Sequence, residues 1–468
     1  MKRTKIICTL GPATEDPAVI SRMLKAGMNV ARLNLSHGTH EEHEKKIKGL
    51  RSLSCVTAIM ADLQGPRIRT GLFKNKKAVL KQGDKVRLTS RNVAGDDSLI
   101  PIFPSSVMKD IRKGECVFID GGTIKIRVDS VRGGEAKGTV IEGGEVGEHK
   151  GLNLPNSKLR MPALTEKDHD DLLWAIRMGV DFVALSFVRS AKDVLKVKEI
   201  IKKRRSKISV IAKLEKPEAI ADLDEIIKAS DGVMVARGDL GIEMSLAKVP
   251  VIQKEVIEKA RILSKPVIIA TQMLESMVKD ERPTRAEVSD VANAIFDGAD
   301  AVMLSEETAI GIHPLEAVKI MARIVTEAER SIEYFTNTDH RKFSIDFSVS
   351  HAACSIAQEL GAKAIITFTE SGSTALRVSK YRPKTTIIGI VTCDETLRKL
   401  SLYFGLRPLK IKPFKYIDQM IENAEAGLLK EKIVGKNDVV VLTAGIPINI
   451  PGTTNLIKVH KIGGQLFR

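Results

Sequence analysis

Short apolar runs and helical patterns alternate along the first sixty residues. The apolar runs at residues 4–10, 29–35 and 56–63 each have the length of a strand that is buried on both faces. Helical patterns cover residues 15–26 and 41–50 between them. This alternation predicts the first units of a parallel α/β fold.

The pattern changes after Gly65-Pro66. Residues 67–155 are rich in Gly and Val, and turn pairs such as Gly121-Gly122 and Gly133-Gly134 interrupt them. Alternating apolar and polar positions at 116–119 and 124–128 are typical of strands with one buried face. We therefore predict a small all-β module here.

Strand and helix patterns resume after the module. Five further strand candidates lie at residues 182–187, 208–215, 232–237, 266–272 and 301–306. Three strands before the module and five after it give the eight units of a (β/α)8 TIM barrel, with the β module inserted after the third strand.

A polar stretch at about residues 335–347 predicts a linker to a further domain. Beyond it, strand patterns at 364–369, 386–391 and 439–443 alternate with helices, which predicts a C-terminal α/β sandwich domain. The expected boundaries are 1–66 and 158–335 for the barrel, 67–157 for the β-rich module and 336–468 for the C-terminal domain.

The positive net charge of the chain indicates which kinds of ligand it attracts. The 468 residues include 74 Lys and Arg against 58 Asp and Glu, a net charge of +16, which suits nucleic acid or an acidic small substrate. Aromatic residues make up only 4%, which is poor material for stacking bases, so we expect no nucleic-acid partner.

The sequence also favours a cytoplasmic protein. No apolar run approaches the ~20 residues that cross a bilayer, and the first apolar run is too short for a signal peptide. The five cysteines are scattered, with no CxxC pair, as expected of reduced thiols. We expect no membrane partner.

Polar residues follow the predicted strands toward their carboxyl ends. Arg32, Asn34 and Ser36 share one face of a strand, because side chains alternate with period two. A barrel strand is covered on both faces, so this polar face needs partners. Active sites of these barrels form at that end.

Other strand ends repeat the signature. They carry Lys213 and Glu215, Arg237 and Asp239 on either side of Gly238, Asp62, Thr271-Gln272, and Ser305-Glu306-Glu307. Glu215 and Asp239 are suited to Mg²⁺, which takes one or two protein carboxylates together with substrate and water oxygens. With Arg32 and Lys213 facing an anion, the set indicates phosphoryl transfer.

Several motifs have ordinary explanations. His37, His40 and His43 do not form HExxH, and we expect exposed polar residues at a helix start. Neither a P-loop nor a Rossmann fingerprint is present. Thr284 to Glu287 is a capping box. Thr369 to Thr374 follows a strand and opens a helix, which is typical either of an anion site or of plain N-capping.

Long motifs identify a resemblance. Residues 4–14 (TKIICTLGPAT), 28–38 (MNVARLNLSHG), 234–241 (MVARGDLG), 270–277 (ATQMLESM), 282–294 (RPTRAEVSDVANA) and 452–455 (GTTN) closely resemble the pyruvate kinase family, from Thr4 to about Gly463. The resemblance implies a barrel, a β-rich lid, an α/β C-terminal domain and a homotetramer. It also implies the glycolytic reaction of phosphoenolpyruvate and ADP to pyruvate and ATP, with Mg²⁺ or Mn²⁺.

The resemblance assigns roles position by position. Lys213 and Arg32 hold the transferred phosphoryl group, and Glu215 and Asp239 bind the metal. The substrate carboxylate lies on the backbone around Gly238 and Asp239 and on Thr271. Thr271 and Ser305 line the face where the enolate is protonated, with a water relay as the expected donor. The nucleotide contacts are Pro12, His37, Arg69 and, from the lid, Lys150.

One short stretch and one further position depart from the family pattern. The monovalent-cation site is matched by Asn34, Ser36, Asp62 and the carbonyl of Leu63. Family members that need K⁺ have a threonine, a lysine and a glutamate where this chain has Leu63, Gln64 and Arg67. A fixed guanidinium can replace the charge of the ion, so we expect K⁺ not to be required. Glu306 replaces the usual glycine, and the sequence does not explain it.

The loop of Thr369, Ser371, Gly372, Ser373 and Thr374 aligns with the family's effector loop, where a phosphorylated effector can bind; the sequence determines neither whether this chain has an effector nor which one. Two rival classes remain open at this point. One is a Mg²⁺-dependent enolate lyase or mutase on a related barrel, and the other is a catalytically silent regulatory or RNA-binding protein.

Overall fold

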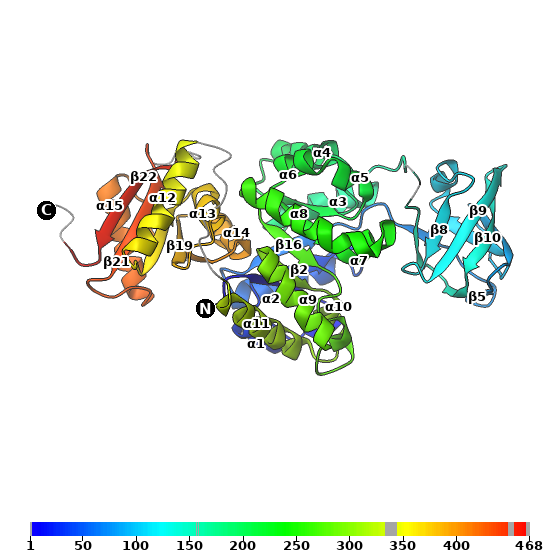
Figure 1. Ribbon diagram of the computed structural model, residues 1–468, viewed down its shortest axis with the longest axis horizontal. Coiled ribbons are helices and arrows are strands. Elements are labelled where there is room, and N and C mark those ends of the chain that lie inside the picture. Colours follow the sequence, from blue (N-terminus) through cyan, green and yellow to red (C-terminus); the bar gives the residue numbers. More distant parts are fainter. Residues whose placement is uncertain (1, 156, 158, 333–343, 448–453, 465–468) are drawn as a thin grey trace.

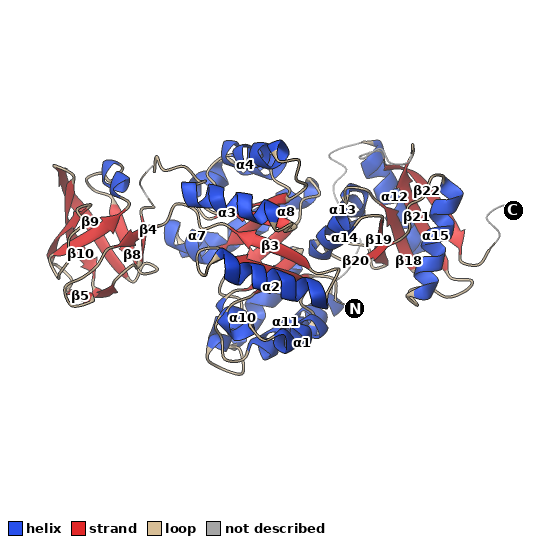
Figure 2. Cartoon of the chain, turned by 180° about the vertical axis from the view of Figure 1, so that it is seen from behind, coloured by secondary structure: helices blue, strands red, loops and turns tan. Residues whose placement is uncertain are grey.

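The computed structural model describes residues 2–155, 157, 159–332, 344–447 and 454–464, which form three units in a row. Figures 1 and 2 show a barrel in the middle, the β-rich lid at one end and the C-terminal α/β unit at the other. No helix in these residues is long and apolar enough to cross a membrane.

Eight parallel strands close the central barrel in the order β1-β17-β16-β15-β14-β13-β3-β2. They are β1 (Lys5–Thr9), β2 (Val30–Asn34), β3 (Ala58–Asp62), β13 (Phe182–Leu185), β14 (Ser209–Leu214), β15 (Gly232–Ala236), β16 (Val267–Ala270) and β17 (Ala301–Leu304). Each strand lies inside an apolar run that predicted it, and the predicted fold class is confirmed.

Helices surround the barrel (Figure 1). The helices that complete the eight β/α units are α1 (Pro17–Ala26), α2 (His40–Leu53), α3 (Glu166–Arg177), α4 (Ala191–Lys203), α6 (Leu223–Ala229), α8 (Val249–Ile262), α9 (Arg285–Asp297) and α11 (Pro314–Arg330). Short helices α5 (Pro217–Ala221), α7 (Arg237–Glu243) and α10 (Glu306–Ala309) follow strands β14, β15 and β17. Capping boxes start α2, α3 and α9, and the α9 box at Thr284 confirms the prediction.

Alternation along the strands fills the barrel interior in layers. Ile7, Met60, Phe182, Ile211 and Met234 are buried in one cluster inside the barrel. The next inward-facing positions toward the carboxyl ends are polar and include Arg32, Asp62 and Lys213, all buried. The barrel is therefore an apolar column that ends in a layer of buried charge.

The lid is a second, smaller closed barrel in the order β10-β6-β7-β4-β12-β8-β9, with β11 and β5 paired beside it. Its strands are β4 (Ile68–Thr70), β5 (Lys77–Leu80), β6 (Lys85–Thr89), β7 (Leu99–Phe103), β8 (Cys116–Ile119), β9 (Ile124–Arg132), β10 (Glu135–Glu142), β11 (Gly144–Gly147) and β12 (Gly151–Asn153). The lid has its own apolar core, so it moves as one body if its connections move.

The C-terminal unit has a five-stranded sheet in the order β20-β19-β18-β21-β22. The strands are β18 (Ala364–Phe368), β19 (Thr386–Val391), β20 (Leu406–Lys410), β21 (Val439–Gly445) and the antiparallel β22 (Thr454–Lys461). Around them lie α12 (Ile345–Glu359), α13 (Ser373–Ser379), α14 (Asp394–Lys399) and α15 (Ile417–Lys430). The sequence did not predict β20 and β22, because both are edge strands with mixed polar and apolar positions.

The predicted domain boundaries stay predictions. Much of the predicted linker at 335–347 lies outside the described residues, and its last residues belong to α12, which begins at Ile345. Residues 156 and 158, on either side of the boundary at 157, also lie outside them.

A buried carboxylate fastens the C-terminal unit to the amino ends of the barrel strands. Asp181, just before β13, is 2% exposed. Its oxygens accept from Arg398 Nε of α14 and from Arg51 Nη2 of α2, each at 2.7 Å, and from the Ile59 amide at 2.8 Å. Because both cations are mostly covered, the carboxylate cannot be removed without leaving buried charge unpaired.

We predict that Asp181→Asn lowers the free energy of unfolding by about 3–5 kcal/mol, because two largely buried guanidinium groups lose their counter-ion. The measurement is denaturant unfolding, with Asp170→Asn as control, since the Asp170 side chain is 79% exposed and lies 3.8 Å from His169 Nδ1. If Asp181→Asn lowers the free energy of unfolding no more than the control does, the ion pairs of Asp181 with Arg51 and Arg398 do not hold the C-terminal unit on the barrel.

Candidate active site

The layer of buried charge at the carboxyl end of the barrel is organised around Asp62. Its Oδ2 lies 2.7 Å from Arg32 Nε, and its Oδ1 lies 3.2 Å from Lys213 Nζ. Lys213 Nζ also contacts Glu215 Oε1 at 2.9 Å and donates to Ser186 Oγ at 2.7 Å. The ends of β2, β3, β13 and β14 thus meet in one network, in which Ser186 after β13 was not among the predicted residues.

Pairing favours the charged forms of Asp62 and Lys213. Burial acts to raise the pKa of Asp62, but the Lys213 ammonium and the Arg32 guanidinium outweigh it and lower the pKa overall. Burial acts to lower the pKa of Lys213, but Asp62 and Glu215 raise it overall. The site therefore presents a permanent ammonium and guanidinium to whatever enters.

Glu215 and Asp239 supply two carboxylates on neighbouring strand ends. Burial raises the pKa of Glu215, and the nearby Asp239 adds to the effect, while Lys213 opposes it. Glu215 Oε2 accepts from the Phe187 amide at 2.7 Å, and its buried Oε1 is paired with the Lys213 ammonium at 2.9 Å.

The donor set fits a divalent cation that shares its ligands with a substrate. The described residues hold no cluster of three or more His, Cys, Asp or Glu side chains that would form a complete metal site. Two carboxylates that leave other positions to substrate and water oxygens are the arrangement typical of Mg²⁺.

The ends of β15, β16 and β17 form the other side of the mouth. The Gly238 amide donates to Thr271 Oγ1 at 2.7 Å, and Thr271 has a φ of 69°. The Ser305 amide donates to buried Glu307 at 2.6 Å. Arg237 turns away from the mouth, because its guanidinium pairs with Asp290 of α9 at 2.6 Å.

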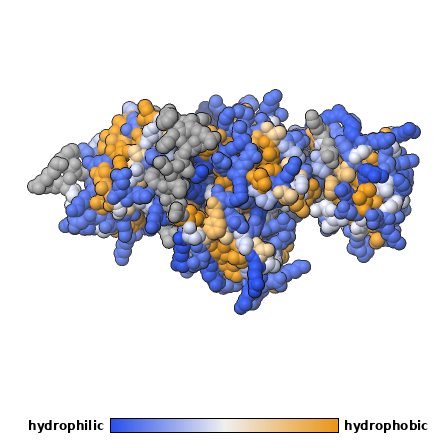
Figure 3. Space-filling view, viewed as in Figure 1, coloured by the Kyte–Doolittle hydropathy of each residue, from blue (hydrophilic) through white to orange (hydrophobic). Residues whose placement is uncertain are grey.

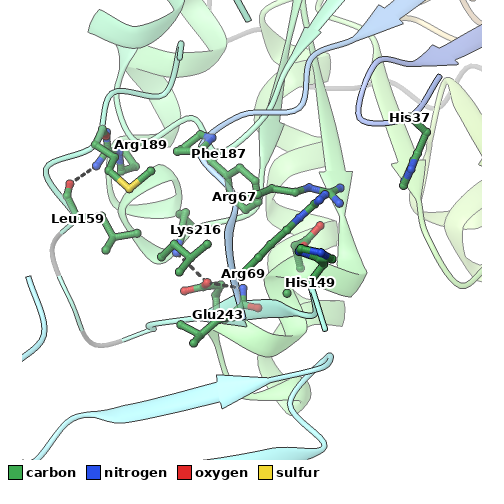
Figure 4. A pocket seen from close by; sticks show the side chains of 16 residues that line it. His37, Arg67, Arg69, His149, Leu159, Phe187, Arg189, Lys216 and Glu243 are labelled. Carbon is green, nitrogen blue, oxygen red and sulfur yellow. Dashed lines mark hydrogen bonds and ion pairs between the residues drawn. The ribbon is translucent and has the colours of Figure 1, made fainter. Parts of the chain in front are cut away.

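A cavity of about 450 Å³ lies between this mouth and the lid. Figure 4 shows the basic side chains that line it: Arg67, Arg69, Arg189 and Lys216, together with the imidazoles of His37 and His149. Burial lowers the pKa of Arg69, and neighbouring Arg67 adds to the effect. So many cations around one cavity fit a ligand with several negative charges.

The structure places only some of the predicted nucleotide contacts at this cavity. His37 and Arg69 line it. Lys150 instead pairs with Asp120 within the lid at 3.1 Å. Pro12 starts a 3-10 turn (Pro12–Thr14) that packs against α10 and is not among the lining residues.

A buried trio at the lid connection was not predicted. Glu243 Oε1 accepts from Lys216 Nζ and from Asn153 Nδ2 of the lid, both at 2.7 Å. Lys216 and Glu243 are 7% and 4% exposed. Their residue types carry no signal of this contact, since the three positions lie far apart along the chain and only the fold brings them together.

The residues predicted for a monovalent cation hold internal partners. Both Asp62 oxygens are paired, and Leu63 O accepts from Ser186 Oγ at 2.7 Å. Asn34 Oδ1 accepts from the Ser36 amide at 3.2 Å. Arg67 lies at the neighbouring cavity.

The histidines after β2 correct one expectation. His43 was expected to be exposed, but it is 4% exposed, and its Nε2 donates to His37 O at 2.8 Å. It packs against Trp174, on which His40 stacks with a ring separation of 4.7 Å. The helical pattern hides this burial, because the covering surface comes from α3, far along the chain.

Glu306 occupies the first position of α10 and is exposed. A carboxylate there interacts favourably with the positive end of the helix dipole. Burial and the cations Arg67, Arg69 and Arg32 lower the pKa of His37, and Glu306 acts against them. Glu306 therefore lies close enough to the mouth for its charge to act there.

The loop at Thr369 to Thr374 lies at the opposite end of the barrel. The Gly372 amide donates to Thr369 Oγ1 at 2.9 Å, Ser371 Oγ donates to Ser373 Oγ at 3.2 Å, and Thr374 Oγ1 is 2.8 Å from Thr454 Oγ1. Ser371 and Ser373 border a cavity of about 280 Å³ that Ser209, at the start of β14, lines from the barrel side.

A (β/α)8 barrel with paired carboxylates, a buried lysine and a cationic cavity at its carboxyl end has the features of a metal-assisted phosphotransferase. The chain matches the family model "Pyruvate kinase, barrel domain" over residues 1–318 and "Pyruvate kinase, alpha/beta domain" over 348–460. The chain belongs to the pyruvate kinase family.

Relatives extend the match to the full length. Pyruvate kinases of Sporosarcina psychrophila and Staphylococcus aureus strain MRSA252 are each 42% identical, over 100% of this chain and 82% and 81% of their own. The crystal structure of a pyruvate kinase from Cryptosporidium parvum is similar with a TM-score of 0.92 at 36% identity, and the match covers 98% of this chain and 96% of that one.

We predict that Asp62→Asn lowers the free energy of unfolding by about 3–5 kcal/mol, because Arg32 and Lys213 stay buried with one countercharge fewer. Thermal and denaturant unfolding in the absence of substrates measure this. Stability equal to that of the parent chain would mean that the network is relaxed by water and is not held by Asp62.

Proposed function

We propose that the polar layer around Asp62 carries out the reaction of the pyruvate kinase family, in which a phosphoryl group passes from phosphoenolpyruvate to ADP to give pyruvate and ATP. The observation that supports this assignment is Lys213, a buried ammonium held between Asp62 and Glu215 and close to Arg32. Phosphoryl transfer depends on positioning and on neutralising charge, and this cluster supplies both.

The two cations hold the transferred group. Lys213 stabilises the phosphoryl group as it leaves the enolate oxygen, and Arg32 binds the same group from the neighbouring strand ends. Both are fixed by Asp62, so little reorganisation accompanies the reaction. The backbone at Gly238 and the hydroxyl of Thr271 bind the substrate carboxylate, and a mutual hydrogen bond already positions them.

Glu215 and Asp239 hold Mg²⁺ or Mn²⁺. When bound, the ion neutralises charge on the phosphoryl oxygens. Pyruvate kinases as a family use a divalent cation, and the two neighbouring carboxylates Glu215 and Asp239 support the same for this chain. Thr271 and Ser305 line the face where the enolate takes its proton, and a water relay delivers that proton.

The cationic cavity receives ADP. His37 and Arg69, which line the cavity, contact the nucleotide, and Pro12 joins them from the turn before α1. Lys150 joins them when the lid closes and the ammonium leaves Asp120. Closure excludes water from the transfer. An enolate lyase or mutase needs no nucleotide, so a cavity rich in cations next to the metal ligands favours the kinase over that rival.

Arg67 takes the place of K⁺. Its side chain lines the cavity. In the sequence it comes shortly after Asp62 and Leu63, which together with Asn34 and Ser36 match the monovalent-cation site. A fixed guanidinium supplies the positive charge there without an ion.

The barrel exposes apolar side chains on its helices. Exposed apolar side chains on α8 and α9 and near α10, such as Val251, Phe296 and Ile312, support assembly of copies into a homotetramer. Figure 3 shows hydrophobic patches on the surface of the barrel.

The loop of Thr369, Ser371, Gly372, Ser373 and Thr374 binds a phosphorylated effector. The enzyme works in the cytoplasm.

We predict that Lys213→Met lowers kcat at least ~10²–10³-fold while the chain stays folded, because the transferred group loses its buried ammonium. Pyruvate formation from phosphoenolpyruvate, ADP and Mg²⁺ measures the rate. Lys198→Met is the matched control, since Lys198 pairs with Asp231 on the outer face of the barrel. A near-normal rate in Lys213→Met would remove the assigned role, and no activity in the parent chain would favour the silent regulator.

We predict that the parent chain is active without K⁺ and that Arg67→Glu makes activity depend on K⁺, because the site then lacks a fixed positive charge. Rates are compared with and without K⁺ at constant ionic strength. A many-fold activation of the parent chain by K⁺ would refute the stand-in role of Arg67.

A further inference from the structure

The lid is joined to the barrel by two segments that meet at the start of α3. The first leaves β3 and passes through residues 63–67 into β4, and the second returns through residues 159–165 into α3. Figure 2 shows α3 on the side of the barrel that faces the lid. Arg67 is the last residue of the first segment, and Arg69 follows in β4. Both line the cationic cavity.

One carboxylate contacts both segments. Asp168, in the first turn of α3, is 0% exposed. Its Oδ1 accepts from the Gly65 amide of the first segment at 3.0 Å. Its Oδ2 accepts from the amide and the hydroxyl of Thr165, the end of the second segment, at 3.0 and 2.6 Å.

These contacts exceed what helix capping requires. The bonds between Asp168 and Thr165 are an ordinary capping box. The bond to Gly65 is additional and spans 103 residues. Among the ion pairs of the described residues, none includes Asp168, so three donors and the start of α3 stabilise a fully buried carboxylate.

Gly65 is held in a fixed conformation at this point. Its φ is 70°, and a Cβ there would lie 2.7 Å from the Phe187 ring. Arg189 holds the second segment alone, because it donates to the carbonyls of Leu159 and Met161 (2.5 Å to Met161). Glu243 holds Asn153 of β12, which lies outside both segments. Asp168 contacts the two segments together.

We propose that Asp168 is a positioning residue that fixes both lid connections to the barrel and thereby places Arg67 and Arg69 for the nucleotide. The inference rests on the proposed function for its kinetic consequence. The substrate groups on the barrel, Arg32, Lys213 and Thr271, do not depend on the lid connections, whereas the nucleotide groups do. A change at Asp168 therefore affects ADP more than phosphoenolpyruvate.

Asp168→Asn tests this, because an amide has one acceptor oxygen where the two segments need two. We expect the KM for ADP to rise roughly tenfold and kcat to fall, since small misplacement of binding groups is costly. We expect the KM for phosphoenolpyruvate to change less than twofold. Hydrogen exchange should be faster at the amides of residues 63–67 or at Thr165, whichever loses its acceptor.

Glu287→Gln is the matched control. Glu287 holds the same position in the capping box of α9 and also reaches a distant amide, that of Ser276 at 2.7 Å, but touches neither lid segment. We expect a comparable loss of thermal stability without the selective rise in the KM for ADP. If both variants show the same kinetics, Asp168 is only a helix cap and the proposal is wrong.

If Asp168→Asn does not fold, the same measurements are made on Asp168→Glu. This variant keeps the negative charge and both acceptor oxygens but moves them one methylene farther from the backbone. A selective rise in the KM for ADP supports the proposal, and unchanged kinetics with unchanged exchange overturns it. If the parent chain forms no pyruvate, the proposed function fails, while hydrogen exchange still decides whether Asp168 holds the lid connections.

Discussion

The structure depends on the pairing of Asp62 with Arg32 and Lys213 inside the barrel. Charges buried in a closed column of side chains are tolerated only when they neutralise one another. Asp62 meets this condition with one oxygen for each cation, at 2.7 and 3.2 Å. The same pairing lowers the pKa of Asp62, raises that of Lys213 and fixes both cations where an anion enters.

Buried carboxylates also join the other units to the barrel. Asp181 at the amino ends of the strands fastens the C-terminal unit through Arg398, and Asp168 and Glu243 at the carboxyl ends hold the lid connections. Each carboxylate accepts from donors on at least two segments. A carboxylate suits this task because its two oxygens offer about four acceptor sites in one small group.

Much of the fold follows from local patterns. The eight barrel strands are predictable because each is buried on both faces and reads as a short apolar run bounded by polar residues. The charged residues Arg32, Lys213, Glu215 and Asp239 are detectable because they interrupt that pattern at the strand ends. Strands β20 and β22 were not predicted, because edge strands are not buried on both faces. His43 was wrongly predicted to be exposed, because the helix that covers it, α3, lies far along the chain.

The sequence by itself determined the barrel, the inserted β module, the family and the set of charged residues at the strand ends, since all of these are properties of neighbouring positions and their period. Only the tertiary structure decided which charges meet. Asp62 with Lys213, Glu243 with Asn153, and Asp168 with Gly65 are separated by 151, 90 and 103 residues. Partners so far apart are chosen by the closure of the barrel, which sets distances that no local pattern records.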